Sequence, residues 1–312
     1  MKKIVLFFGI LFLGLSAAAQ ETYLYARRDT CDLYLDVYRP AEGTETAFEG
    51  LAKPTVVFVF GGGFYSGQRS DDFTRQWFQR LNENGYTLVT IDYRLGMKGY
   101  RMGKGLRGAY QASKQFYASQ QMGVEDLFSA IRFLSDNSVE LGIDPANLVV
   151  AGSSAGAIIS QAAEYDILCG RTGELPVGFQ FKGVMAFAGA VISLDGPPRY
   201  ASAPCPTLML HGTADKAVAY NKFAAFGRGI WGSDFLARQW HKRGYDSYCI
   251  YRFKDRTHDV AAYMNYIWEL EKEFLEQNVI LGKSRNIDAV IDDPSLPTWS
   301  WTEVTLDSMY RK

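Results

Sequence analysis

The 312-residue sequence has little histidine, little cysteine and almost no net charge. Its 33 basic and 34 acidic residues leave a formal charge of −1, so its charge does not indicate a nucleic-acid partner. The four cysteines show neither metal-site spacing nor the density of a disulfide framework; they are Cys31, Cys169, Cys205 and Cys249. We expect no metal, no cofactor and at most one disulfide, with buried free thiols the alternative.

A long hydrophobic run occurs at the N-terminus. Two lysines precede an apolar stretch over residues 4–15, and small residues follow at 16–20. This order is typical of a secretory signal peptide, and the run is short for a membrane-spanning helix. We expect residues 1–20 to be a signal peptide cleaved near Ala19 or Gln20. The protein is then secreted or periplasmic, without a stable membrane anchor.

Beyond the leader, the pattern is that of one α/β domain. After an antiparallel hairpin expected at 23–39, apolar strands alternate with amphipathic helices, which predicts a mostly parallel sheet covered by helices on both faces. Strands are expected at 55–60, 87–92, 148–151, 184–187, 207–211 and 247–253, and helices at 72–84, 124–134, 233–243 and 259–277. We assign residues 21–282 to the domain, with an insert at 96–120 and a tail at 283–312 that Trp299 and Trp301 pack onto it.

Residues 152–156 read Gly-Ser-Ser-Ala-Gly and directly follow the apolar run at 148–151. A Gly-x-Ser-x-Gly turn between a strand and a helix exposes its central serine, because small flanking residues let the strand and the helix pass closely. We therefore predict that Ser154 is a nucleophile. The pentapeptide is common in loops, and the strand before it and the apolar start of a helix after it make it more specific.

A serine nucleophile needs a base to accept its proton, and the sequence has three histidines. His258 lies in a polar loop after a strand and is the predicted base. His211, at a strand end, is expected to be structural, and His241 is expected on a solvated helix face. Asp215, after the preceding strand, is the predicted acid that orients the base. Its rivals are Asp255 and Asp259, which are too close to His258 in sequence, and Asp195.

Three glycines end the first buried strand, at residues 61–63 after Phe60. Glycines let backbone N–H groups turn toward a developing oxyanion. A phosphate-binding loop is the alternative, but it would require a following Lys-Ser/Thr or a further spaced glycine, and the sequence has neither. We predict an oxyanion loop.

The order Ser154, Asp215, His258 and the glycine loop resemble those of α/β-hydrolases, in particular the bacterial carboxylesterase group. The sequence is similar to hormone-sensitive-lipase-like esterases and more closely to secreted bifunctional feruloyl and acetyl xylan esterases, over about residues 34–276. The resemblance implies an oxyanion hole formed by the amides of Gly62, Gly63 and Ala155.

The sequence departs from that group at Phe60, where the group has histidine, so an orienting hydrogen bond is missing there. Residues 92–95, Asp-Tyr-Arg-Leu, also resemble the group and are expected to be scaffold. Few residues are available for a cap, which predicts an open site with little or no cap.

These features predict a secreted serine carboxylesterase acting on small or polysaccharide-attached esters, with acetyl or hydroxycinnamoyl groups favoured. A serine peptidase of the dipeptidyl or prolyl type and a non-catalytic binding module remain as alternatives. The insert at 96–120 is either a solvated basic loop or a wall of the pocket whose aromatic residues stack on sugar or aryl groups. The sequence leaves the oligomeric state open.

Overall fold

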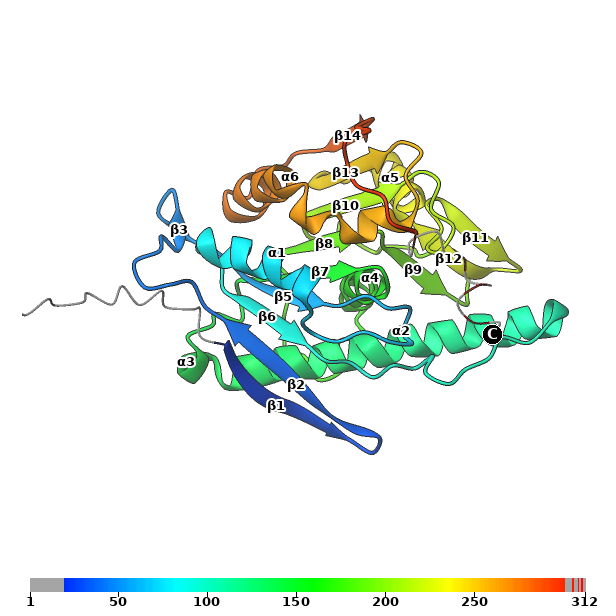
Figure 1. The fold of residues 1–312 in the computed structure, drawn as a ribbon, viewed down its shortest axis with the longest axis horizontal. Coiled ribbons are helices and arrows are strands. Elements are labelled where there is room, and N and C mark those ends of the chain that lie inside the picture. The colour runs from blue at the N-terminus through cyan, green and yellow to red at the C-terminus, as the bar shows by residue number, and fades with distance from the viewer. Residues whose placement is uncertain (1–19, 301–304, 306–307, 309, 311–312) are drawn as a thin grey trace, which may run out of the picture.

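The computed structural model describes residues 20–300 together with Thr305, Ser308 and Tyr310. Its centre is a nine-stranded sheet in the order β1-β2-β6-β5-β7-β8-β10-β13-β14 (Figure 1). The strands from β6 to β14 are parallel, whereas β1 and β2 form an antiparallel hairpin at one edge. The strands are β1 Gln20–Arg28, β2 Cys31–Tyr38, β5 Thr55–Val59, β6 Leu88–Ile91, β7 Leu148–Ser153, β8 Gly183–Phe187, β10 Thr207–Gly212, β13 Tyr248–Phe253 and β14 Ile287–Ile291.

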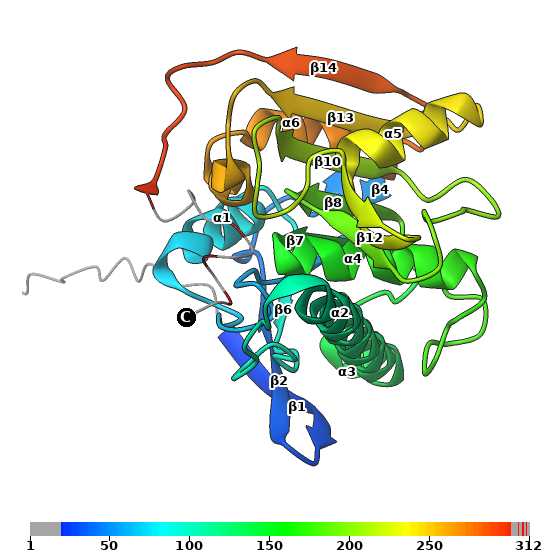
Figure 2. The ribbon, with the colours of Figure 1, turned by 90° about the vertical axis from the view of Figure 1, so that its right-hand side faces the viewer.

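Helices cover both faces of this sheet. On one face lies α1 (Asp72–Glu83), whose Trp77 packs edge-on against Phe58 and Phe187 of the sheet, with ring centroids 5.4 and 5.9 Å apart. The other face carries α2 (Gly105–Asp136), α4 (Ala155–Leu168) and α5 (Ser233–Lys242), and Figure 2 shows α2 and α4 side by side. The predicted mostly parallel sheet with helices on both faces is confirmed.

Smaller elements complete the fold. A second sheet has the order β11-β12-β9, and a two-stranded ribbon pairs β3 with β4. Their bounds, with those of the short helices, are β3 Ala47–Phe48, β4 Leu51–Ala52, α3 Ser138–Leu141, β9 Ala190–Ser193, β11 Lys222–Ala225, β12 Arg228–Gly232, the 3₁₀-helix η1 His258–Asn265, α6 Trp268–Glu273 and the π-helix η2 Phe274–Ile280.

The structure corrects two predicted element boundaries. The closing helix predicted at 259–277 is divided into η1, α6 and η2. Local hydrogen bonds explain the tight first part. The Ser153 hydroxyl donates to the Ala261 carbonyl, and the Tyr266 amide donates to the Tyr263 carbonyl three residues earlier. The helix predicted at 124–134 begins at Gly105, so most of the predicted insert is its N-terminal part.

The tail also contributes to the sheet. Its residues 287–291 form β14, which pairs in parallel with β13 along its whole length. Trp299 contacts Phe73, Tyr263 and Tyr266, with centroid separations of 5.9–6.1 Å, as expected for a residue that packs the tail onto the domain. Trp301 and the predicted signal peptide, apart from Gln20, lie outside the described residues.

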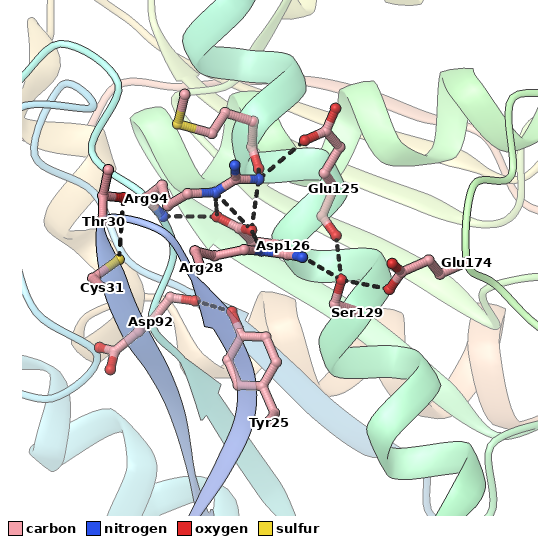
Figure 3. A network of polar contacts seen from close by, with 11 residues as sticks. Tyr25, Arg28, Thr30, Cys31, Asp92, Arg94, Glu125, Asp126, Ser129 and Glu174 are labelled. Atoms are coloured by element: carbon pink, nitrogen blue, oxygen red, sulfur yellow. Dashed lines mark hydrogen bonds and ion pairs between the residues drawn. The ribbon is translucent and has the colours of Figure 1, made fainter.

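A buried carboxylate on α2 fixes the edge hairpin to the domain (Figure 3). Asp126 is inaccessible to solvent and forms ion pairs with Arg28 at the end of β1 (3.1 Å) and with Arg94 after β6 (2.8 Å). It also accepts the Arg94 backbone amide at 2.8 Å. Arg94 and Asp92 belong to the segment expected to be scaffold, and Asp92 in turn pairs with Arg69. These contacts give that segment a structural role.

The four cysteines, all of which lie among the described residues, are free thiols. No helix within the described part of the chain has both the length and the apolar character needed to cross a bilayer.

Glu271 of α6 is an ionisable group in the core whose replacement should stabilise the protein. The side chain is fully buried; Oε2 accepts a hydrogen bond from Trp77 Nε1 at 2.5 Å, and Oε1 has no partner among the described residues. Burial raises the pKa of Glu271 well above its ordinary value, and Trp77 and Arg80 offset only part of this.

Because this pKa is higher in the folded state, unfolding releases a proton above about pH 4.3, and stability falls by about 1.4 kcal/mol per pH unit up to the folded pKa. Glu271→Gln removes this loss. We expect its melting temperature to exceed that of the wild type by more at pH 8 than at pH 5. Glu269→Gln, an exposed control on the same helix, should show no such difference. Equal melting temperatures of wild type and Glu271→Gln at both pH values would contradict the assignment.

Candidate active site

Ser154 lies in the sharp turn between β7 and α4. Its φ of 52° and ψ of −115° are strained for a residue with a side chain, and the side chain is half-buried. The flanking glycines are required by close approach: a Cβ at Gly156 would lie 2.0 Å from the Val59 carbonyl oxygen, and one at Gly152 would lie 2.3 Å from Gly156. The strained turn predicted from Gly-x-Ser-x-Gly is therefore present.

The structure brings Ser154, His258 and Asp215 together. Each residue follows the carboxyl end of a parallel strand, namely β7, β13 and β10, and these ends meet at one edge of the sheet. His258 Nε2 lies 2.7 Å from Ser154 Oγ, and Nδ1 lies 2.7 Å from Asp215 Oδ2. His258 and Asp215 are 7% and 8% exposed, so their hydrogen bond is shielded from water.

Hydrogen bonding determines which ring nitrogen carries the proton. An ionised carboxylate only accepts, so Nδ1 of His258 donates to Asp215 and Nε2 accepts from the Ser154 hydroxyl. Burial by itself would raise the pKa of Asp215. The charge of His258 and the hydrogen bonds from His211 and His258 outweigh burial and hold this pKa well below its ordinary value. The acid therefore stays ionised, and His258 is poised to accept the serine proton.

His211, the rejected base, lies behind Asp215 rather than beside the serine. It is inaccessible to solvent; Nδ1 is 2.9 Å from Ser233 Oγ and Nε2 is 3.1 Å from the Val218 carbonyl oxygen. Nε2 also lies 3.4 Å from Asp215 Oδ2. Since a carbonyl oxygen only accepts, Nε2 carries the proton, and His211 adds a donor facing the acid.

The other candidates named from the sequence are His241, Asp195, Asp255 and Asp259. His241 is exposed on α5, and Asp255 and Asp195 are exposed in loops. Asp259 accepts hydrogen bonds from Thr257 Oγ1 (3.0 Å) and the Trp299 amide (3.1 Å). Asp215 has further support, since its Oδ1 accepts the amides of residues 217 and 218 at 2.8 and 3.0 Å.

The glycine loop and the start of α4 place backbone amides next to Ser154. Gly62 has a φ of 112°, and a Cβ there would lie 2.0 Å from the Ser66 carbonyl oxygen. The Gly62 carbonyl accepts the amides of Tyr65 and Ser66 at 3.0 and 3.1 Å. In a trans peptide the carbonyl and the following N–H point in opposite directions, so this turn orients the Gly63 amide.

Ala155 is the first residue of α4, where N–H groups have no partner within the helix and the helix dipole favours negative charge. Among the described residues, none accepts a hydrogen bond from the amide of Gly62 or Gly63. Gly63 and Ala155 line the same pocket as Ser154 and His258. The arrangement can hold an oxyanion on the serine side of the pocket.

Aromatic packing holds Phe60, the residue before the glycine loop. The Phe60 ring stacks on Tyr93 with centroids 4.4 Å apart, and the Tyr93 hydroxyl donates to the Phe60 carbonyl at 3.0 Å. This pair fixes the start of the glycine loop from the segment that follows β6.

The pocket walls include segments far apart in the sequence. Beside the triad, it is lined by Phe116 of α2, Ile192 of β9, Ile230 of β12 and Tyr310 of the tail. Gln120 joins two of these walls, since its side chain donates to the Ile192 carbonyl at 3.0 Å and accepts the Ile192 amide at 2.8 Å.

The predicted insert therefore supplies a wall through Phe116. Phe116 lies one helical turn from the buried Ala112 and one from the buried Gln120. This spacing is the feature of the sequence that could have indicated that Phe116 faces inward. Two other aromatic residues of the insert are poorly placed to stack on a sugar. Tyr100 packs partly buried against the core, and Arg228 lies over the Tyr110 ring, 4.7 Å from its centroid.

Part of the sequence is similar to known esterases and to other proteins. Residues 17–163 match the Carboxylesterase family. Acetylcholinesterase of Bungarus fasciatus is 33% identical over 125 residues, which cover 40% of this chain and 18% of that protein. Neuroligin-2 of Mus musculus is 32% identical over 163 residues, which cover 46% of this chain and 17% of that protein. The chain thus spans less than a fifth of the length of either relative.

The similarity to solved structures extends over more of the chain than the similarity to these relatives. The esterase Est2 of Thermogutta terrifontis with propionate bound has a TM-score of 0.58 and 22% identity, and the match covers 82% of this chain and 93% of that one. At this identity the likeness shows the fold. The chain therefore has the α/β-hydrolase fold, and its first half resembles the Carboxylesterase family over residues 17–163.

Proposed function

We propose that the protein is an exported serine carboxylesterase that removes acetyl, other short acyl or hydroxycinnamoyl groups from carbohydrate. The observation that carries the proposal is the hydrogen-bonded chain Ser154–His258–Asp215 beside an apolar pocket. Ester hydrolysis by these three hydrogen-bonded residues needs no cofactor.

In the proposed reaction, Ser154 Oγ attacks the ester carbonyl carbon while His258 Nε2 takes the hydroxyl proton. The carbonyl oxygen becomes an oxyanion held by the amides of Gly62, Gly63 and Ala155. Collapse breaks the bond to the alcohol oxygen, which receives the proton from His258. A water molecule then releases the acyl group from Ser154 by the same steps, and the acid is set free.

Three features favour an ester of a bulky alcohol. The sequence predicts export, its motifs resemble those of feruloyl and acetyl xylan esterases, and the pocket opens to solvent beside a half-buried serine. Solved structures of Est2 have propionate or butyrate bound, and one is phosphorylated by paraoxon. By analogy we expect short acyl groups and organophosphorus reagents to reach Ser154.

Similarity to these relatives does not by itself indicate catalysis, because neuroligin-2 is not named as a hydrolase. The purified protein is expected to hydrolyse 4-nitrophenyl acetate and to release acetate from acetylated xylan. It should cleave a matched acetyl 4-nitroanilide far more slowly, and a fluorophosphonate probe should label it once per chain.

The two alternatives give different results in the same experiment. Preferred cleavage of a peptide-like amide over the matched ester would identify a peptidase. Neither labelling nor ester hydrolysis, in a protein that is folded by circular dichroism, would identify a binding module.

A further inference from the structure

The tail places Tyr310 in the pocket beside the nucleophile. Its side chain is buried, with 3% of its surface exposed, and its ring packs edge-on against Phe116 of α2 with centroids 5.1 Å apart. The Tyr310 hydroxyl donates a hydrogen bond to the Gly63 carbonyl, and its backbone carbonyl accepts the Met102 amide at 3.0 Å. The ring is therefore held by α2, by the oxyanion loop and by the segment that precedes α2.

The pocket that Tyr310 lines suits the acyl part of an ester. Once an acyl group is attached to Ser154 with its oxygen toward the Gly63 and Ala155 amides, its remaining carbons lie either in this pocket or in solvent. The surrounding side chains are mainly apolar, from residues 64, 116, 158, 192, 218 and 230. A sugar would lose hydrogen bonds to water there, whereas a hydrocarbon chain would lose none. The alcohol therefore points toward solvent.

The pocket has room for a small group. Its cavity volume is about 30 Å³, and the wider space of about 400 Å³ around it includes open solvent. The cavity is far smaller than the ~300–1,000 Å³ found in pockets that enclose a drug-sized molecule. The Tyr310 and Phe116 rings occupy space that a longer acyl group would need.

We propose that Tyr310 determines acyl specificity: its ring closes the acyl pocket and restricts the enzyme to acetyl and similarly short acyl groups. This inference rests on the proposed function and narrows it, because a hydroxycinnamoyl group is excluded while the ring is in place. The hydroxyl bond to Gly63 and the contact with Phe116 hold the ring in that position.

The test compares kcat/KM for 4-nitrophenyl acetate, 4-nitrophenyl octanoate and methyl ferulate. In Tyr310→Ala the octanoate-to-acetate and ferulate-to-acetate ratios should rise at least about tenfold, because a methylene that gains or loses its place in a pocket changes specificity by about 10- to 200-fold. Tyr310→Phe, which keeps the ring, should leave both ratios within about twofold. Tyr110→Ala is the matched control, since it removes a half-exposed tyrosine from α2.

Phe116→Ala removes the ring against which Tyr310 packs and should shift the ratios in the same direction, which provides a second test if Tyr310→Ala does not fold. Unchanged ratios in the folded variants would overturn the inference while leaving the esterase intact. A shift in Tyr310→Phe as large as in Tyr310→Ala would also overturn it, because the ring would then not be the wall. Failure of the proposed function is seen separately, as a wild type that hydrolyses none of the three esters.

Discussion

Ser154→Ala is expected to lower ester hydrolysis about a millionfold while leaving the fold intact. Removal of the nucleophile from an unrelated serine triad has about this effect on kcat. Here Ser154 Oγ lies 2.7 Å from His258 Nε2, so alanine removes the attacking atom and leaves the base without its proton donor. The measurement is kcat on 4-nitrophenyl acetate, with circular dichroism to show folding and a fluorophosphonate probe to show loss of labelling.

The neighbouring Ser153 provides a matched control. Its hydroxyl donates to the Ala261 carbonyl at 2.7 Å, a contact between the elbow and the helix that begins at His258. Ser153→Ala loses one hydrogen bond, worth about 1 kcal/mol of stability, and should still be labelled by the probe. Retention of more than a few per cent of activity in Ser154→Ala would contradict the assignment. Loss of labelling in Ser153→Ala alone would assign the nucleophile to Ser153.

Asp215→Asn is expected to lower kcat by about 10⁴, the effect of the same change in another triad. The backbone amides of residues 217 and 218 donate to Asp215 Oδ1. An asparagine would keep its oxygen at that position, so its NH₂ group would face His258 Nδ1. His258 would then accept at Nδ1 and carry its proton on Nε2, where it cannot take the serine proton. His258→Ala should approach the loss seen for Ser154→Ala.

Asp255→Asn is the control for the acid, because Asp255 is close to His258 in sequence and exposed. It should keep near wild-type activity. In the wild type the logarithm of kcat/KM should not fall with a slope of two on the acid side, since the pKa of Asp215 is held low and this carboxylate stays ionised there. A slope of two, or an inactive Asp255→Asn beside an active Asp215→Asn, would contradict these roles.

The local sequence pattern was enough to predict the central strands and the candidate residues that follow them. Five of the six predicted central strands consist of buried residues throughout, as in β5 and β10, and such continuous apolar runs are readable without knowledge of their neighbours. The Gly-x-Ser-x-Gly elbow could be recognised because its steric requirement is local. The order Ser154, Asp215, His258 followed from the same reading, since side chains after parallel strands lie at one edge.

The local sequence pattern was insufficient where a segment is stabilised by contacts with residues far away in the sequence. The start of α2 has no side-chain N-cap, and its polar and aromatic residues are as compatible with a loop as with a helix. It is extended by packing against β9 through Gln120 and against the tail through Phe116. Strand β14 has only alternate residues half-buried, a weak signal for a strand that exists by pairing with β13.

The sequence by itself determined the α/β architecture, the strained turn at Ser154 and which histidine and aspartate to consider, because each depends on residues close together in the chain. Only the tertiary structure decided how His258 is oriented by Asp215, what supports the start of the glycine loop, and that Tyr310 lines the pocket. Those contacts join residues 33 to 247 positions apart. Such contacts form when the chain folds around one sheet, and they produce no periodic pattern of hydrophobic residues in the sequence.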